Sequence, residues 1–204
     1  MTRWAMVIDL RKCMGCRACM QACGMENLVP IDYTALDAGE QMLKWVSGEI
    51  EYYNMRVLQL SFDGKLQHIP IPCMHCDKPP CVEWCPTGAS YKRSDGIVMV
   101  DSERCIGCKT CITVCPYGAR YVRKSSVTGS HVGVVDKCKM CFHLVDKGEL
   151  PACARVCPSK AIIFGDIDNP QSEVRKLLTS VDPTKVKVLK KELGTRPNVF
   201  YIGL

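Results

Sequence analysis

Sixteen cysteines are the residues of this sequence whose type and spacing could do chemistry. They form four groups of four, and two groups have the C-x2-C-x2-C-x3-C spacing typical of bacterial iron–sulfur ferredoxins. The other two lengthen the gap before the third cysteine, but each still ends in C-x3-C. Such thiolate sets hold cubane [4Fe-4S] clusters. The groups are I (Cys13, Cys16, Cys19, Cys23), II (Cys73, Cys76, Cys81, Cys85), III (Cys105, Cys108, Cys111, Cys115) and IV (Cys138, Cys141, Cys153, Cys157).

The fourth cysteine of each group predicts that the groups work in pairs. In two-cluster ferredoxins the fourth cysteine binds the other cluster, so one motif cannot close its own site. Groups II and III lie close together in sequence, which leaves groups I and IV as the second pair. Sequential pairing, I with II and III with IV, is the rival arrangement. Exchange within the nested pairs predicts four ligand sets: Cys13, Cys16, Cys19 with Cys157; Cys138, Cys141, Cys153 with Cys23; Cys73, Cys76, Cys81 with Cys115; and Cys105, Cys108, Cys111 with Cys85.

Two other uses of cysteine are weighed against iron. Eight disulfides would need an oxidising compartment and would not explain why three of the four C-x3-C endings are followed by proline. Structural zinc prefers two C-x2-C pairs separated by a spacer, and only group IV resembles that pattern. His75 and His143 lie beside cysteines of complete sets, so we expect them to donate hydrogen bonds near sulfur. Most cations beside the cysteines are expected to be solvated, and a minority to raise a cluster's potential: Lys12, Arg17, Lys109, Lys137 and Lys139.

The segments around the cysteine groups repeat as strand, loop, short helix and strand. An apolar run ending in aspartate precedes three groups, and alanine opens another strand-like run after three of them. Asp95-Gly96 predicts a hairpin between groups II and III. We therefore predict an α+β fold of two ferredoxin-like modules, the second inserted in the first, with long loops and little regular structure. The split module covers 1–60 plus 129–166, the inserted module 61–128, and a C-terminal docking tail 167–204.

Two segments carry no cysteine. The segment 28–66 contains Trp45 and Tyr52-Tyr53 and is interpreted as loop and hairpin material. The tail is expected to hold a helix capped by Asn169 or Ser172, with Val174, Leu177 and Leu178 on one face, and then an extended apolar strand suited to docking.

Composition restricts the function further. The chain has 204 residues and a formal charge of +6, which sixteen thiolates on iron clusters would bring close to zero, so a nucleic-acid surface is a poor inference. The N-terminus does not read as a signal peptide, and no apolar run reaches the roughly 18 residues of a membrane span. No paired acid and base, nucleophile constellation or G-x-G-x-x-G is present. We expect a chain without substrate chemistry of its own.

Several segments together resemble one family over nearly the whole chain. The sequence is similar to the four-cluster iron–sulfur subunits of the dimethyl sulfoxide reductase family, within it most to the iron–sulfur subunit of polysulfide, thiosulfate or tetrathionate reductases. The segments that carry the resemblance are A-M-V-I-D at 5–9, C-M-G-C at 13–16, E-N-L-V-P at 26–30, C-V-E-W-C-P-T-G-A at 81–89, C-P-Y-G-A-R-Y at 115–121 and G-T-R-P-N-V-F-Y at 194–201.

The resemblance implies a complex in anaerobic respiration. A catalytic subunit with a molybdenum or tungsten bis-pterin cofactor would face the split module, and a quinol-reactive membrane subunit would face the inserted one. Some relatives lack one cysteine of group III and hold a three-iron cluster there. Cys108 fills that position here, which favours four iron atoms in every site. The alternative is a cluster subunit of a hydrogenase-type or nitrite-reducing complex. In either case the chain would be peripheral to the cell membrane through partners, on a side that the sequence leaves open.

Overall fold

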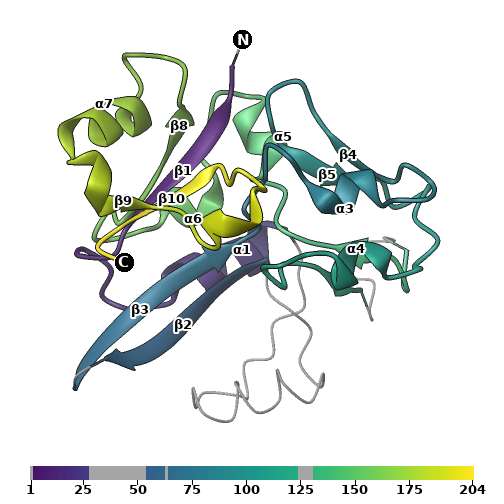
Figure 1. The fold of residues 1–204 in the computed structure, drawn as a ribbon, viewed down its shortest axis with the longest axis horizontal. Coiled ribbons are helices and arrows are strands. Elements are labelled where there is room, and N and C mark those ends of the chain that lie inside the picture. The colour runs from purple at the N-terminus through teal and green to yellow at the C-terminus, as the bar shows by residue number, and fades with distance from the viewer. Residues whose placement is uncertain (1, 28–53, 63, 124–130) are drawn as a thin grey trace.

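The helices and strands of this protein are short. The computed structural model describes residues 2–27, 54–62, 64–123 and 131–204 (Figure 1). The mixture of small sheets and short helices agrees with the predicted α+β class. The strands are β1 (Trp4–Asp9), β2 (Met55–Phe62), β3 (Lys65–Pro72), β4 (Ser90–Lys92), β5 (Val98–Val100), β6 (Tyr121–Val122), β7 (Val135–Asp136), β8 (Ile162–Asp166), β9 (Val186–Lys187) and β10 (Val199–Ile202). The helices are α1 (Ala18–Glu26), α3 (Pro80–Glu83), α4 (Thr110–Thr113), α5 (Phe142–Val145), α6 (Ala152–Arg155), α7 (Glu173–Ser180) and the 3-10 turns η1 (Pro183–Lys185) and η2 (Lys191–Leu193).

The largest sheet joins the two ends of the chain. Its strand order is β8-β1-β10-β9, with β1 antiparallel to β8 and parallel to β10. The strand before Cys13 therefore pairs with the strand after Cys157, in a register that sets Val7 opposite Ile163. This pairing brings the start of group I and the end of group IV to the same end of the sheet.

Strand β1 is apolar from Trp4 to Ile8, and both of its faces are covered. Successive side chains of a strand point to opposite faces. Met6 and Ile8 accordingly join the main core with several cysteines, whereas Ala5 and Val7 join a second core under α7. Helix α7 is capped, as predicted, by Ser172, whose Oγ accepts a hydrogen bond from the backbone N–H of Arg175 at 3.1 Å.

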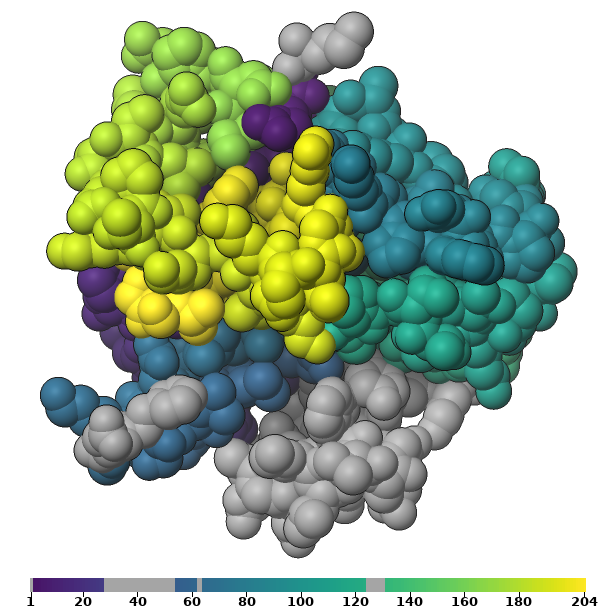
Figure 2. All heavy atoms as spheres, in the orientation of Figure 1, coloured from purple at the N-terminus to yellow at the C-terminus, as the bar shows by residue number. Residues whose placement is uncertain are grey.

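The C-terminal strand is not free for docking, which corrects the expectation for that part of the tail. Strand β10 lies between β1 and β9, and Tyr201 is fully buried with its hydroxyl donating to the carbonyl oxygen of Pro70 at 2.9 Å. The segment before it packs on the group II loop: the Lys78 N–H donates to the Thr195 carbonyl at 3.0 Å. Figure 2 shows this yellow segment lying against the blue-green chain of groups II and III.

Two short ladders connect the cysteine groups. β4 and β5 form the predicted hairpin between groups II and III, with Gly96 at φ 89° in its turn. β6 and β7, which follow group III and precede group IV, also pair, and the sequence did not predict this link. The longer hairpin of β2 and β3 projects from the body of the molecule (Figure 1).

Some expectations fall on residues that the structure leaves undescribed. Trp45, Tyr52 and Tyr53 lie outside the described residues. The boundary expected between residues 60 and 61 falls inside β2. In the described part of the chain no helix is both long enough and apolar enough to cross a membrane.

Candidate metal centres

All four cysteine loops share one backbone feature. The residue before the second cysteine of each group has a positive φ: 72° at Gly15, 41° at His75, 69° at Gly107 and 51° at Met140. This left-handed turn lets two cysteines separated by two residues face the same space. Glycine marks the turn in groups I and III, a signal that the predictions from sequence left unused. Groups II and IV place larger residues there, so spacing alone could not reveal the common turn.

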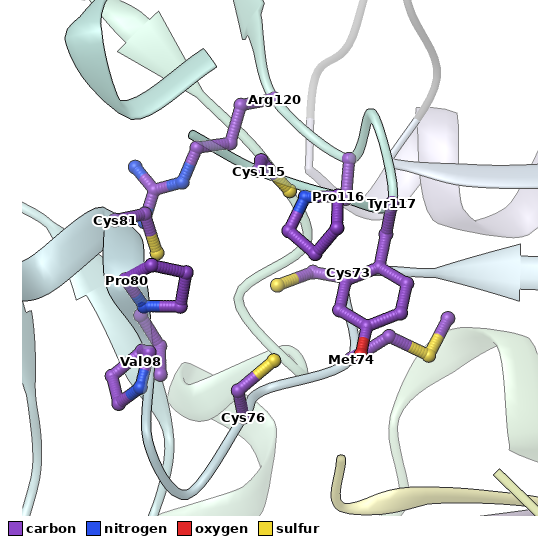
Figure 3. Close-up of a pocket in the computed structure, with 12 residues that line it drawn as sticks. Cys73, Met74, Cys76, Pro80, Cys81, Val98, Cys115, Pro116, Tyr117 and Arg120 are labelled. Carbon is purple, nitrogen blue, oxygen red and sulfur yellow. The ribbon is translucent and has the colours of Figure 1, made fainter. Parts of the chain in front are cut away.

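Four sulfurs from groups II and III surround one cavity. Cys73, Cys76, Cys81 and Cys115, here called the Cys73 quartet, line it together, and Figure 3 shows their sulfurs pointing into a common space. Burial, followed by the neighbouring Cys73 sulfur, raises the pKa of Cys76 to about 12. The Cys76 thiol is therefore strongly disposed to be neutral unless a cation compensates the thiolate.

A second cavity takes the remaining cysteines of groups II and III. Cys85, Cys105, Cys108 and Cys111 line it and form the Cys105 quartet. The backbone N–H of Ser90 donates to the Cys85 sulfur at 3.3 Å, and that of Val135 to the Cys105 sulfur at 3.5 Å. Cys108 is exposed, and its hydrogen bonds with Thr110 lower its pKa. This quartet is the more open of the two.

A third cavity joins opposite ends of the sequence. Cys13, Cys16, Cys19 and Cys157 line it and form the Cys13 quartet. The backbone N–H of Ala161 donates to the Cys157 sulfur at 3.2 Å, just where the chain enters β8. Burial, followed by the sulfur of Cys13, raises the pKa of Cys19 to about 12, whereas Cys16 is exposed at the edge.

The last four cysteines are all buried and lie near one another. Cys23, Cys138, Cys141 and Cys153 form the Cys138 quartet. Burial raises the pKa of Cys23 well above its usual value, and the sulfurs of Cys138, Cys153 and Cys141 add to the rise. One side chain spans the group: the Asn27 amide nitrogen lies 3.6 Å from the Cys23 sulfur and 3.5 Å from that of Cys141.

The quartets follow one another as a row. Cys19 and Cys23, both on α1, belong to the Cys13 and Cys138 quartets. The sulfur of Cys73 is, after burial, the next cause that raises the pKa of Cys138, so the Cys138 and Cys73 quartets are neighbours. Cys81 on α3 and Cys85 just after it belong to the Cys73 and Cys105 quartets. From one end of the row to the other, the order is therefore the Cys13 quartet, the Cys138 quartet, the Cys73 quartet and the Cys105 quartet.

Two cations beside the quartets are buried, contrary to the usual place of such charges. Lys137 is fully buried, and its Nζ donates to the carbonyl oxygens of Val98 and Cys138. Arg120 is also buried, and its Nη2 donates to the Cys81 sulfur at 3.0 Å. No role was predicted for Arg120 from the sequence. Its only signal was a charge within an apolar strand-like segment.

The two histidines have different partners, and only His143 departs from the expectation. The Nδ1 of His75 accepts a hydrogen bond from the backbone N–H of Val98 at 3.0 Å, so this nitrogen donates to no sulfur. Burial, followed by the charges of Lys137 and Arg120, lowers the pKa of His75 well below its usual value. His143 was expected near sulfur. Its Nε2 lies 2.8 Å from a carboxylate oxygen of Glu26 instead, which corrects that prediction.

The donor sets fit multi-iron clusters in kind and in arrangement. Each quartet is made only of cysteine sulfur, the ligand type of Fe–S clusters, and all sixteen cysteines are free thiols. In three quartets the sulfurs line the walls of a cavity. In the described parts of the chain no three His, Cys, Asp or Glu side chains converge closely enough to hold a single metal ion. Backbone N–H groups and one guanidinium donate to the sulfurs, as cluster ligands require.

Comparison with known families identifies the same motifs. A family model described as a 4Fe-4S dicluster domain matches residues 65–167, and a second model with the same description matches residues 12–89. Together these matches include every cysteine group. They overlap within the second group and do not follow the module boundaries that we predicted.

Individual relatives align over almost the whole chain. A tetrathionate reductase subunit of Salmonella typhimurium is 40% identical over 202 residues, covering 99% of this chain and 73% of that protein. A polysulfide reductase subunit of Wolinella succinogenes is 38% identical over 201 residues, covering 98% and 94%. An Hdr-like menaquinol oxidoreductase iron–sulfur subunit of Archaeoglobus fulgidus is 37% identical over 228 residues, covering 99% and 84%.

Proposed function

Because this chain belongs to the 4Fe-4S dicluster family of iron–sulfur subunits of dimethyl sulfoxide reductase-type respiratory enzymes, we propose that it carries four [4Fe-4S] clusters and relays electrons between two partner subunits. When bound, each cluster accepts and passes on one electron at a time. The chain itself binds the clusters, fixes their order and keeps water from the inner ones. It performs no substrate chemistry.

One observation carries this proposal: cysteines distant in sequence lie around common cavities in the combinations that exchange of fourth ligands requires. Cys157 lies with Cys13, and Cys115 lies with Cys73. The proposed ligands are the four quartets, one for each cluster. The nested modules, 1–60 plus 129–166 around 61–128, with the tail 167–204, follow from this assignment as part of the proposal. Support comes from the antiparallel pairing of β1 with β8 across the inserted segment.

The proposed partners follow from the relatives. A molybdopterin catalytic subunit would exchange electrons at the Cys13 end of the row, and a quinol-reactive membrane subunit at the Cys105 end. Both ends suit transfer to another protein because Cys16 and Cys108 are exposed there. Exposed apolar side chains lie beside them, Met14 at one end and Ile106 at the other. The chain would be held peripherally at the membrane by these partners.

A second candidate is favoured by the Archaeoglobus relative, whose name places it in a menaquinol oxidoreductase of another type. In that case the chain would serve a different electron-transfer complex, such as the hydrogenase-type or nitrite-reducing complexes. The row of clusters and its ligands would be unchanged. Purification from native membranes separates the two candidates, since a molybdopterin subunit co-purifies only in the first.

The cluster content is tested by metal analysis. Protein purified without oxygen should contain about sixteen iron and sixteen acid-labile sulfide per chain, with negligible zinc. It should be brown, with broad absorbance near 400 nm that reduction bleaches. Eight iron or fewer in fully anaerobic material contradicts the proposal of four clusters. Zinc in place of iron contradicts the electron-transfer role itself.

A further inference from the structure

Arg120 lies between two cysteine quartets: it donates to a sulfur of one, and its charge acts on a sulfur of the other. Its Nη2 donates to the Cys81 sulfur of the Cys73 quartet at 3.0 Å, and its Nη1 donates to the Ser90 hydroxyl at 2.9 Å. Figure 3 shows the guanidinium reaching from the Cys115 side of the cavity to Cys81. In the Cys105 quartet, burial raises the pKa of Cys111, and the charge and hydrogen bond of Arg120 oppose that rise.

Lys137 occupies the equivalent place between the Cys73 and Cys138 quartets. Its Nζ donates to the carbonyl oxygen of Cys138 at 2.7 Å and to that of Val98. Its charge acts on the sulfur of Cys138 in one quartet and on that of Cys81 in the other. The Cys73 quartet therefore has a buried cation on each side, and each neighbouring quartet shares one of them.

Neither cation is neutralised by an acidic side chain in the described part of the chain. The hydrogen-bond partners of both side chains are carbonyl oxygens, a hydroxyl and sulfur. The nearby Asp136 is already paired with Arg123 and Lys139. A buried charge is costly unless an opposite charge compensates it. The negative charge of cysteine-bound clusters is the compensation that these positions offer.

We propose that Arg120 and Lys137 are potential-setting residues, each of which favours reduction of the two clusters on either side of it. Reduction adds a negative charge to a cluster, so a fixed cation beside it stabilises the reduced form. The cluster in the Cys73 quartet is favoured twice, those in the Cys138 and Cys105 quartets once, and that in the Cys13 quartet by neither. The inference rests on the proposed function, since it requires clusters in all four quartets.

The two cations predict two different patterns of potentials, measured by redox titration of the full, cluster-loaded chain with paramagnetic resonance. In Arg120→Gln the reduced-to-oxidised ratio at a fixed poise should fall about tenfold for the clusters of the Cys73 and Cys105 quartets, a shift of about 59 mV for one electron. In Lys137→Gln the same loss should affect the clusters of the Cys73 and Cys138 quartets. The Cys13 cluster should keep its potential in both.

Three variants separate charge from structure. Arg120→Lys keeps the charge and loses the planar fork, so its potentials should stay nearer to the parent values than those of Arg120→Gln. Arg175→Gln removes an equal charge from the exposed face of α7 and should change no potential. Ser90→Ala releases the guanidinium from its anchor and should shift the same two clusters less, in the same direction. If Arg120→Gln loses iron, Ser90→Ala tests instead whether Arg120 sets the potentials of these two clusters.

Iron analysis of the parent chain keeps this test apart from the proposed function. A parent chain without four clusters contradicts the proposed function, whatever the variants do. If the parent is fully loaded and neither substitution changes a potential, the proposed role of the two cations is overturned. The proposed function is then unaffected. The same conclusion follows if all four clusters shift together, because that result indicates a general effect on the fold. Unchanged potentials in Ser90→Ala overturn the role of Arg120 when Arg120→Gln cannot be loaded.

Discussion

A Cβ atom built on Gly107 would lie 2.5 Å from the carbonyl oxygen of Gly133. Gly107 is in the loop between the first two cysteines of group III, whereas Gly133 leads into β7 before group IV. Gly107 also has φ 69°, a conformation that other residues rarely adopt. The group III loop and the chain leading to group IV can therefore approach this closely only because both steric demands are met by glycine.

We predict that Gly107→Ala destabilises the Cys105 quartet selectively. The left-handed backbone costs alanine about 1 kcal/mol or more, and the contact with a backbone oxygen adds to that cost. The expected result is a lower thermal midpoint and loss of the Cys105 cluster signal in paramagnetic resonance. Gly148→Ala is the matched control, because Gly148 has φ 78° with open space around its Cβ position. Equal losses in the two variants would show that the approach to Gly133 is unimportant.

A second prediction concerns the cap of α7. Ser172→Ala removes a side chain that accepts from the Arg175 N–H and donates to the Asp166 carbonyl at 2.5 Å. Loss of such a cap costs about 0.5–2 kcal/mol. The thermal midpoint should fall while iron content stays at the parent value, since α7 packs on the face of β1 that carries no cysteine. Ser180→Ala, at the other end of the helix, is the control. Iron loss in Ser172→Ala would contradict this separation of the two cores.

Cysteine spacing predicted much of this architecture, because thiolate geometry ties spacing directly to structure. The C-x3-C ending of group I places Cys19 and Cys23 on one short helix, and their sulfurs lie in two different quartets. The apolar run before Cys13 predicted a strand. The run is apolar because the strand is covered on both faces. The sequence could not predict that His75 turns its Nδ1 to the Val98 backbone, because that contact depends on how two loops pack. The same reason hid the burial of Lys137, whose sequence neighbours resemble those of the partly exposed Lys139.

A third prediction tests how independent the quartets are. Cys108→Ser should change only the cluster of the Cys105 quartet, leaving a three-iron centre or an empty site there. Cys108 is exposed and its sulfur faces only that cavity, so the three other ligand sets are intact. Paramagnetic resonance of the reduced and oxidised protein distinguishes the clusters. Cys108→Ala, which removes the oxygen ligand that serine offers, is the companion variant. Loss of two or more clusters from a folded protein contradicts the proposed ligand set.

The last prediction decides how the groups pair. In the nested assignment Cys157 belongs to the cluster held by Cys13, Cys16 and Cys19, although it closes the sequence of group IV. Cys157→Ser should therefore damage the cluster of the Cys13 quartet and leave the Cys138 quartet loaded, because Cys138, Cys141 and Cys153 are completed there by Cys23. Cys23→Ser should have the reverse effect.

The pair of variants is informative because the two cysteines lie at equivalent places in their motifs. If each cysteine served its own group, Cys157→Ser would remove the cluster of group IV and Cys23→Ser that of group I, so the two results would be interchanged. Sequential pairing would instead connect Cys157 to group III and spread its loss to the Cys105 quartet. The short distance between the Ala161 N–H and the Cys157 sulfur fixes the cysteine at the start of β8, beside β1 and the loop that begins at Cys13. The selective loss of the Cys13 cluster is therefore the outcome that the fold supports, and iron-specific spectra of the two variants measure it.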